Sequence, residues 1–407
     1  MSSLVPDGWS FTDFGQISSN RKTKFQPEID SERFVYLGLE HLGVASRKIR
    51  DFGSSVDVMS TKTKFYKGDT LFGKLRPYLR KVAYPDFDGI CSTDILALSP
   101  CKNTDAEFLF YICSSDEFIA NAVESSAGNI MPRASWGDLV GFPILYPPLP
   151  EQKKIASILT SVDEVIENTQ KQIDKLQDLK KATMNELLTK GIGHTEFKDS
   201  ELGRIPKSWE VTKFGKVTER FYQGINTVAD KVVYHSTGIP ILQTKHITSG
   251  EITFAAIKYL DEETYLRYKD KFQPRHNDIL LSNIGTIGKS VLVQKPSEYL
   301  IAWNIFLISV TSELEPRFAH LHLQKLDIEN YYENLMTGNA TKFVNKSNLS
   351  DILLTLPSIA EQVEISNILD AIVSKIELQK QKLSQTQSLK KSLMQDLLTG
   401  KVRVTVN

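Results

Sequence analysis

The chain carries the same helix start twice. "PPLPEQKKIASIL" begins at Pro147, and a weaker copy, "LPSIAEQVEISNIL", ends at Leu369. With an offset of 210 residues, positions 151–190 match positions 361–400 at 15 of 40 places without a gap. Similarity over such a long offset indicates a duplicated unit, so any fold of this chain must contain two related halves.

Both copies have the heptad spacing of long paired helices. Alternating steps of four and three place mostly apolar residues along one stripe, as a two-helix seam requires. The signals for helix ends are also present: Pro150 suits a first turn, Ser358-x-x-Glu361 is typical of a capping box, and Gly191 and Gly400 suit helix ends. The predicted seam residues are Ile155, Leu159, Val162, Ile166, Ile173 and Leu176 in the first helix, and Ile365, Leu369, Ile372, Ile376, Leu383 and Leu393 in the second.

We expect the two helices to pack on each other. A run of about 38 residues at ~1.5 Å each gives a rod of roughly 55–60 Å whose apolar stripe needs a partner. The first helix leads from one globular segment to the next and the second must return, which predicts an antiparallel coiled coil. Docking of each helix on a separate partner, or pairing between two chains, remains an alternative.

The segments before the helices repeat more faintly. "PDGWSFTDFG" at Pro6 resembles "PKSWEVTKFG" at Pro206, an offset of 200, so the two halves differ by small insertions. The expected organisation is a globular domain at 1–146, a long helix at 147–192, a second domain at 200–354 and a second helix at 355–402. Alternating apolar segments such as "GICSTDILALSP" and "LIAWNIFLISV" predict strands, and residues 104–123 have helical spacing. The predicted fold class is α/β (α+β), with two globular domains in a pseudo-two-fold arrangement.

Overall charge says little about partners, because 49 basic side chains balance 49 acidic ones. Locally, ten Lys or Arg stand against three Asp or Glu between Arg47 and Lys81, and six against two between Tyr265 and Lys295. Each cluster is either a solvated surface or a binding surface for an anionic partner. The three cysteines form no paired pattern, and we see no signal peptide and no apolar run long enough for a membrane span. We therefore expect a cytoplasmic protein with no membrane partner.

Several stretches resemble catalytic motifs but lack a required residue. "GDTLFGKL" has phosphate-loop spacing, yet Leu75 stands where Ser or Thr must bind magnesium. "YPPL" resembles the loop of amino-methyltransferases, but Tyr146 and Leu149 replace its amide or acid and its aromatic residue. His320-x-His322 would point to different faces of a helix, so we expect no metal site there. The residues therefore indicate a binding protein or scaffold, with no catalytic site.

The chain resembles the specificity (S) subunits of type I restriction–modification systems. The matching segments are "KGDTLFGKLRPYLRKV" from Lys67, "FDGICSTDILALSP" from Phe87, "AGNIMPRASWGDL" from Ala127 and "PPLPEQKKIASIL" from Pro147, and the resemblance covers nearly the whole chain. The second half departs more, because "TGNATKFVNKSNL" lacks the Met-Pro-Arg of the first half.

The resemblance implies a non-catalytic, DNA-binding subunit of a host-defence system. It has two target-recognition domains that each read one half of a bipartite double-stranded DNA site. The paired helices would set the spacing and dock two modification (methyltransferase) subunits, which supply S-adenosylmethionine and methylate adenine, and restriction (translocase and nuclease) subunits would join them. This chain itself would hold no cofactor. Two alternatives are a DNA methyltransferase or nuclease with similar domains and a coiled-coil scaffold for other proteins.

Basic and polar side chains in the predicted loops are the candidates for DNA contacts, because Lys and Arg position phosphates and polar groups read base edges. The same residues also suit ordinary turns. The candidates are Lys62, Lys64, Lys74, Arg76, Arg80, Asn129 and Arg133 in the first domain, and Lys245, His246, Asn283, Thr286, Lys289, Asn339, Lys342 and Lys346 in the second. The polar helix positions repeated in both copies, Gln177 with Gln387 and Lys181 with Lys391, are the candidates for subunit docking.

Overall fold

The computed structural model describes residues 5–44, 47, 49, 51–126, 130–338 and 342–406. The chain divides into two compact units. The first is made from two separate parts of the sequence and the second from one continuous part. Unit 1 comprises Met1–Lys171 and Lys380–Asn407, and unit 2 comprises Gln172–Gln379.

Unit 1 is built on three antiparallel or mixed sheets. Their strand orders are β1-β11, β2-β10-β7-β8 and β3-β6-β9-β4-β5, with β4 and β9 parallel. Helices α2 and α3 cover the central four-stranded sheet, whose buried face includes Phe72, Leu96 and Leu98. The strands are β1 Ser10–Asp13, β2 Ser18–Asn20, β3 Lys24–Phe25, β4 Val35–Leu37, β5 Gly53–Ser54, β6 Lys62–Phe65, β7 Thr70–Gly73, β8 Val82–Ala83, β9 Gly89–Cys91, β10 Ile95–Pro100 and β11 Pro143–Tyr146. The short helices are α1 Phe14–Ile17, α2 Ala106–Ser114, α3 Asp116–Glu124 and α4 Trp136–Leu139.

Unit 2 repeats this plan. Its sheets are β14-β22, β15-β21-β18-β19 and β17-β16-β20, with β16 and β20 parallel, and the hairpin β12-β13 is added. Helix α7 packs on β19 and β21 as the counterpart of α2. The strands are β12 Phe197–Ser200, β13 Gly203–Pro206, β14 Glu210–Lys213, β15 Thr218–Gln223, β16 Ile239–Leu242, β17 Lys258–Leu260, β18 Ile279–Ser282, β19 Ser290–Leu292, β20 Leu300–Ile301, β21 Ile305–Val310 and β22 Leu353–Leu356. The shorter helices are α6 Glu262–Phe272, α7 Pro316–Ile328 and α8 Lys346–Ser350.

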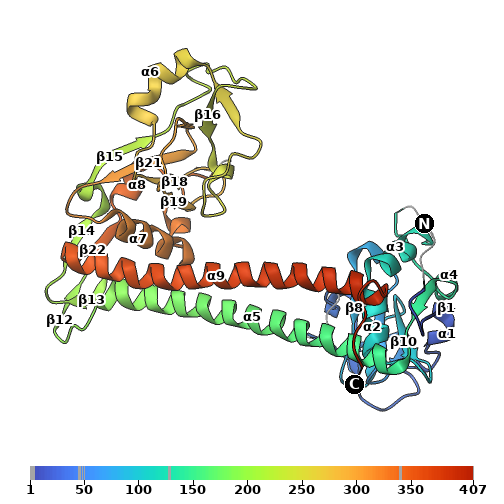
Figure 1. The fold of residues 1–407 in the computed structure, drawn as a ribbon. Coiled ribbons are helices and arrows are strands. Elements are labelled where there is room, and N and C mark those ends of the chain that lie inside the picture. Colours follow the sequence, from blue (N-terminus) through green and yellow to red (C-terminus); the bar gives the residue numbers. More distant parts are fainter. Residues whose placement is uncertain are drawn as a thin grey trace. The chain divides into compact units, whose positions relative to one another are not determined.

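The two long helices are α5, Leu149–Lys190, and α9, Ile359–Leu398. In unit 1 the start of α5 packs on the end of α9, where Ile155 and Leu159 share a core with Leu397 and where Lys390 pairs with Asp163 at 2.6 Å. In unit 2 the end of α5 packs on the start of α9 (Figure 1). The predicted antiparallel pair and the mixed α/β class are therefore confirmed.

Every predicted seam residue lies on the buried side of its helix. Ile155, Leu159, Ile173, Ile365, Leu369 and Ile376 are buried, and Val162, Ile166, Leu176, Ile372, Leu383 and Leu393 are half-buried. A period of 3.5 residues keeps one stripe facing the partner helix, which explains why the alternating steps find buried positions.

A Glu-Gln pair at the start of each long helix connects the helix to its unit. The Gln152 amide donates to the carbonyl of Pro147 and accepts from the N–H of Asp105, which caps α2. Gln362 makes the same contacts with Pro357 and with Glu315, the cap of α7. Both glutamines are fully buried, so each fixes the angle between a long helix and the domain helix beside it.

The glutamate of each pair binds the end of the other long helix. Glu361 accepts from Trp209 Nε1 at 2.9 Å, from the N–H of Ile192 at 3.1 Å, and pairs with His194 Nε2 at 2.7 Å. Glu151 likewise binds the indole N–H of Trp9 and the guanidinium of Arg403. One carboxylate in each unit thus joins the start of one helix to the segment that follows the other.

Glycines complete these junctions. Gly191 and Gly400 follow the helices with φ of +66° and +69°, the left-handed conformation that glycine adopts without steric penalty. A Cβ at Gly191 would lie 2.6 Å from the Trp209 ring, and one at Gly400 would lie 2.6 Å from Pro6 Cγ. Both predicted helix ends are therefore confirmed, and each end packs against the tryptophan region of its own unit.

Two local predictions need correction. The helical segment predicted for residues 104–123 is two helices, because the Ser115 hydroxyl accepts from the N–H of Phe118 and starts α3 anew. At Ser358, the hydroxyl does accept from the N–H of Glu361, at 3.4 Å. The Glu361 carboxylate, however, is bound to Trp209 and His194, so it does not complete a capping box.

Candidate nucleic-acid interface

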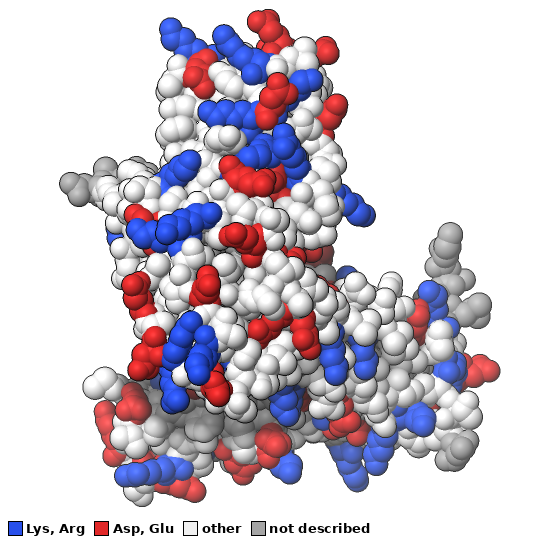
Figure 2. Space-filling model, turned by 90° about the vertical axis from the view of Figure 1, so that its left-hand side faces the viewer, with Lys and Arg blue, Asp and Glu red and all other residues white. Residues whose placement is uncertain are grey.

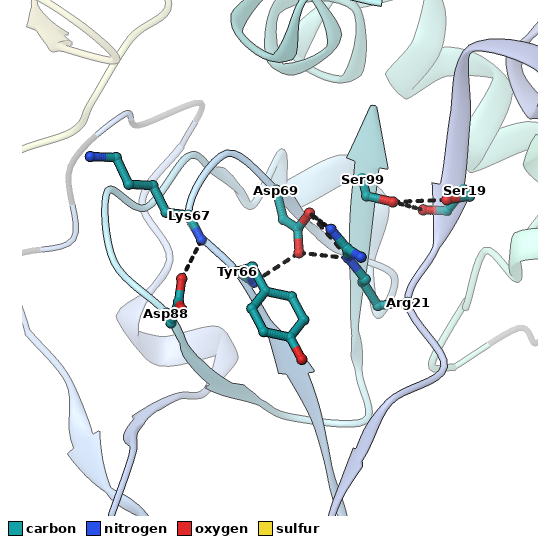
Figure 3. A network of polar contacts seen from close by, with 7 residues as sticks. All are labelled: Ser19, Arg21, Tyr66, Lys67, Asp69, Asp88 and Ser99. Carbon is teal, nitrogen blue, oxygen red and sulfur yellow. Dashed lines mark hydrogen bonds and ion pairs between the residues drawn. The ribbon is translucent and has the colours of Figure 1, made fainter. Parts of the chain in front are cut away.

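A buried aspartate in each unit shapes the turn before a central strand. Asp69, 1% exposed, accepts from the guanidinium of Arg21 at 3.0 Å and from the N–H of Tyr66 at 2.8 Å, directly before β7 (Figure 3). The hydrogen bond with Asp69 raises the pKa of Arg21. Asp278 repeats the arrangement before β18, with Arg220 at 3.0 Å and the N–H of Arg275 at 2.7 Å. The paired charge makes burial of the carboxylate tolerable and fixes the strand that follows.

At the far end of β7, a loop of unit 1 carries three of the candidate residues. It begins at Lys74, whose carbonyl accepts from the N–H of Ala134 at 3.0 Å. The N–H of Arg76 donates to the carbonyl of Pro132 at 2.8 Å, and Leu75 forms a β-bridge with Arg133. The loop and residues 130–134 therefore form one surface. Arg133 is exposed, and its Nε lies 3.1 Å from Asp94.

The equivalent loop of unit 2 follows β18. The carbonyl of Asn283 accepts from the N–H of Val344 at 3.0 Å, and Ile284 forms a β-bridge with Phe343. Beside this loop is a polar hollow of about 400 Å³. Its lining is Gln243, Thr244, Lys245, Thr248, Ile284, Gly285, Thr286 and Asn304. Two candidates, Lys245 and Thr286, thus come together from segments far apart in the sequence.

Several other candidate cations are held by acidic or aromatic neighbours. Lys64 pairs with Asp30 at 3.2 Å, and Lys289 pairs with Asp327 at 2.6 Å. Lys62 donates to Ser60, and burial lowers its pKa. Arg80 pairs with Asp116 at 2.7 Å and donates to the Ser114 carbonyl. Lys346 lies over the Phe221 ring. Figure 2 shows the same mixing, with Lys and Arg side chains beside Asp and Glu over the part of unit 2 that carries α6. The basic clusters of the sequence are therefore partly neutralised in the fold.

Burial removes two candidates from the surface of unit 2. His246 is 1% exposed, and its Nδ1 accepts from the N–H of Gln243 at 2.8 Å, closing a tight turn. Burial lowers the pKa of His246. Asn283 is also 1% exposed. We predicted that these two side chains lie at a DNA-facing surface. The structure corrects this prediction, because both side chains are buried beneath the surface loops.

The remaining candidates differ in exposure and in their contacts. Lys342 is exposed, Lys74 is half-buried, and Lys245 donates to the carbonyl of Ala256 at 3.0 Å. Asn129 and Asn339 lie outside the described residues. Sequence reasoning missed Gln243 and Asn304, which come together because Thr244, two residues after β16, donates hydrogen bonds to Asn304, directly before β21.

Two further hollows lie at equivalent positions along the long helices. One, of about 370 Å³ in unit 2, is lined by Lys181, Met184 and Asn185 of α5 and by the end of α7. The other, of about 360 Å³ in unit 1, is lined by Lys391, Met394 and Gln395 of α9 and by residues 114–117. The docking candidates Gln177, Lys181, Gln387 and Lys391 are all exposed, and Gln387, Lys391 and Arg80 line the second hollow.

Within the described residues, no cluster of three or more His, Cys, Asp or Glu side chains has a geometry that would hold a metal ion. His320 is buried and His322 is half-buried, and desolvation lowers the pKa of each to about 3. The search of the described helices finds none with the length and apolar character of a membrane span.

Two similar α/β units, each with a polar loop surface and each joined to both long helices, define a binding protein with a duplicated surface. The family model of the type I restriction modification DNA specificity domain matches residues 8–178 and again 206–387. The chain therefore belongs to the family of type I restriction–modification specificity subunits, which are non-catalytic.

Individual relatives agree with the family assignment. The type I restriction enzyme MjaVIII specificity subunit of Methanocaldococcus jannaschii is 26% identical, over 98% of this chain and 94% of that protein. The putative MjaX specificity subunit of the same organism is 28% identical over 98% and 95%. The S subunit structure from M. genitalium has a TM-score of 0.57 at 13% identity, covering 100% of this chain and 99% of that one. A chain from a structural study of complex assembly in the type I R-M system has a TM-score of 0.64 at 20% identity, covering 98% and 100%. These likenesses confirm the predicted family and fold.

Proposed function

We propose that this chain reads a bipartite site in double-stranded DNA, one half with each unit. The proposal is supported by one loop that has the same backbone setting in both units but different side chains. The buried Arg-Asp pair and the bridge to a later segment recur in both units. At that shared position unit 1 carries Arg76 and Arg133, whereas unit 2 carries Gly285 and Phe343, with Thr286 and Lys342 directly beside them. A common frame with different polar side chains is suited to reading two different half-sites.

The proposed reading domains span 1–146 and 200–354, and the proposed spacer helices span 147–192 and 355–402. Phosphate contacts would come from Lys74, Lys245 and Lys342, which have no acidic partner within the described part of the chain. Partly neutralised candidates such as Lys64 and Lys289 would need to exchange a carboxylate for a phosphate.

We further propose that the two helix hollows receive the two modification subunits. Lys181 and Lys391 occupy equivalent edges of these hollows, and Met184 and Met394 provide equivalent apolar floors. Two matching sites on one chain support a stoichiometry of two partners. S-adenosylmethionine would be bound in those subunits and the target adenine would be flipped into them, while restriction subunits would join the assembled complex. Because the substrate would be host or invading DNA, we place this function in the cytoplasm.

The test uses the chain alone and in complex with the methyltransferase subunits of its own system. Tritiated S-adenosylmethionine and duplex DNA should give methyl transfer only with the complex. Methylome sequencing should then show one bipartite motif. Exchanging residues 1–146 for those of another specificity subunit should change one half of the motif and leave the other intact. Methyl transfer by the chain alone would favour the enzyme alternative, and binding of the partner without any two-part footprint on DNA would favour the scaffold.

A further inference from the structure

Arg76 has a backbone conformation that arginine rarely adopts. Its φ is +53°, in the left-handed region, and it directly precedes Pro77, which disfavours helical conformations for the residue before it. Unit 2 needs a positive φ at the equivalent position and has Gly285 there, with φ of +81°. Glycine meets this requirement without strain, so unit 1 retains an arginine where its own backbone favours glycine.

The half-buried Arg76 side chain makes no polar contact that would explain its conformation. Its Nε is buried without a hydrogen-bond partner, and within the described residues its guanidinium makes no ion pair. Arg80, four residues later, also has a positive φ, of +54°, but binds Asp116 and the Ser114 carbonyl. That pairing explains Arg80. At Arg76 neither the backbone strain nor the unsatisfied donor is explained by a partner within the described residues.

The equivalent position in unit 2 lies beside a hollow with a mostly polar lining. Gly285 lines the hollow whose other lining groups include the amides of Gln243 and Asn304, the hydroxyl of Thr286 and one cation, Lys245. Amide and hydroxyl groups match the donor and acceptor pattern of base edges, whereas phosphates are bound mainly by cations. An arginine at the matching position offers two parallel N–H groups, the arrangement that fits O6 and N7 of guanine.

We propose that Arg76 reads a guanine of the first half-site through the major groove. At the same position in unit 2, Gly285 has no side chain and leaves room for a base that neighbouring amide and hydroxyl groups contact. The inference rests on the proposed function and specifies a recognition residue within it. Arg133, bridged to the preceding residue and neutralised by Asp94, would support the same loop.

The experiment compares Arg76→Gly, Arg76→Lys and the control Lys67→Ala in complex with the methyltransferase subunits. Lys67 precedes the same strand, and its side chain points away from the Arg21–Asp69 network (Figure 3). Each complex is tested for its methylated motif, for binding to DNA with every base at each first-half position, and for thermal unfolding.

We expect Arg76→Gly to relax one guanine position of the first half-site, with a roughly 5- to 150-fold loss of discrimination there. The second half-site should not change, and the unfolding temperature of the chain should stay the same or rise because strain is released. Arg76→Lys should also lose discrimination, because an ammonium cannot make the paired contact. Lys67→Ala should match the wild type.

Three results would overturn the inference. Equal weakening on all sequences, with a smaller salt dependence, would assign Arg76 to a phosphate. A lower unfolding temperature with an unchanged motif would assign it to the fold. Discrimination retained in Arg76→Gly would remove any role in reading. Failure of the wild-type complex to methylate a bipartite motif would instead refute the proposed function, so the two failures are distinguishable.

Discussion

Replacing Glu361 by Ala should destabilise unit 2 strongly. The carboxylate is 15% exposed and accepts hydrogen bonds from Trp209 Nε1, from the N–H of Ile192 and from His194. Trp209 is 1% exposed, so water cannot readily replace the lost acceptor. A hydrogen bond to a charged group contributes about 1.5–3 kcal/mol, and a buried donor left without a partner costs about as much.

These magnitudes predict a loss of about 3 kcal/mol in the free energy of unfolding. For a unit of this size that corresponds to a fall of roughly 6–12 °C in its unfolding temperature. Glu361→Gln keeps one acceptor oxygen but presents an amide N–H₂ to a donor, so we expect about half the effect. Glu364→Ala is the matched control, because Glu364 is exposed on the same helix and its removal should change stability by at most about 0.5 kcal/mol.

The assay is differential scanning calorimetry of the full chain, with chemical denaturation as a second measure. An unfolding temperature for Glu361→Ala no lower than that of Glu364→Ala would refute the reasoning. It would mean that the indole and the two helix ends hold their positions without the carboxylate. Glu151→Ala should reproduce the effect in unit 1, where Trp9 and Arg403 lose the same acceptor.

Three further outcomes follow from the structure. Burial lowers the pKa of His320 and His322 to about 3, so below pH 6.5 the unfolded chain binds protons that the folded chain does not. The free energy of unfolding should therefore fall by about 1.5–2 kcal/mol per histidine between pH 6.5 and 5. His322→Gln should reduce this dependence of stability on pH, as measured by urea unfolding. Inserting one heptad into each long helix at the unit boundaries, after Lys171 and after Gln379, adds about 10 Å to each helix. Methylome sequencing should then show an unread spacer longer by about three base pairs, and an unchanged spacer would contradict a role of the helices in spacing. Lys181→Glu or Lys391→Glu should each leave one methyltransferase subunit bound, and the double variant none, as measured by native mass spectrometry; full binding by the double variant would place docking elsewhere.

The two long helices and their pairing were predictable, because paired helices require apolar residues at heptad spacing in the sequence. Residues such as Leu159 and Leu369 are buried at the positions that the heptad assigns, and glycines mark both helix ends. The break at Ser115 was not predictable from periodicity, since the apolar residues on both sides of it fit one helical stripe. A hydroxyl that caps the next turn ends the first helix without disturbing that pattern.

The binding surface was less predictable because charge pairing depends on tertiary contacts. Lys64 meets an acid 34 residues away, and Lys289 meets one 38 residues away. Counting charges in a window cannot reveal such partners. Burial of His246 likewise follows from packing of the turn after β16, where a tight turn uses the imidazole as an acceptor. The strain at Arg76 has no sequence signal either, because only its φ distinguishes it from any arginine before proline.

The discontinuity of unit 1 determines when the chain can finish folding during synthesis. Leu397 and Leu398 belong to its core, and Arg403 binds Glu151 and the carbonyl of Asp7. The ribosome makes all of unit 2 before these residues emerge, so unit 2 can close first although most of unit 1 is synthesised earlier. Until the last helix is released, the first unit keeps an open apolar surface. We therefore expect a nascent chain to complete unit 2 before unit 1, and a prematurely terminated chain to leave part of the apolar core of unit 1 uncovered.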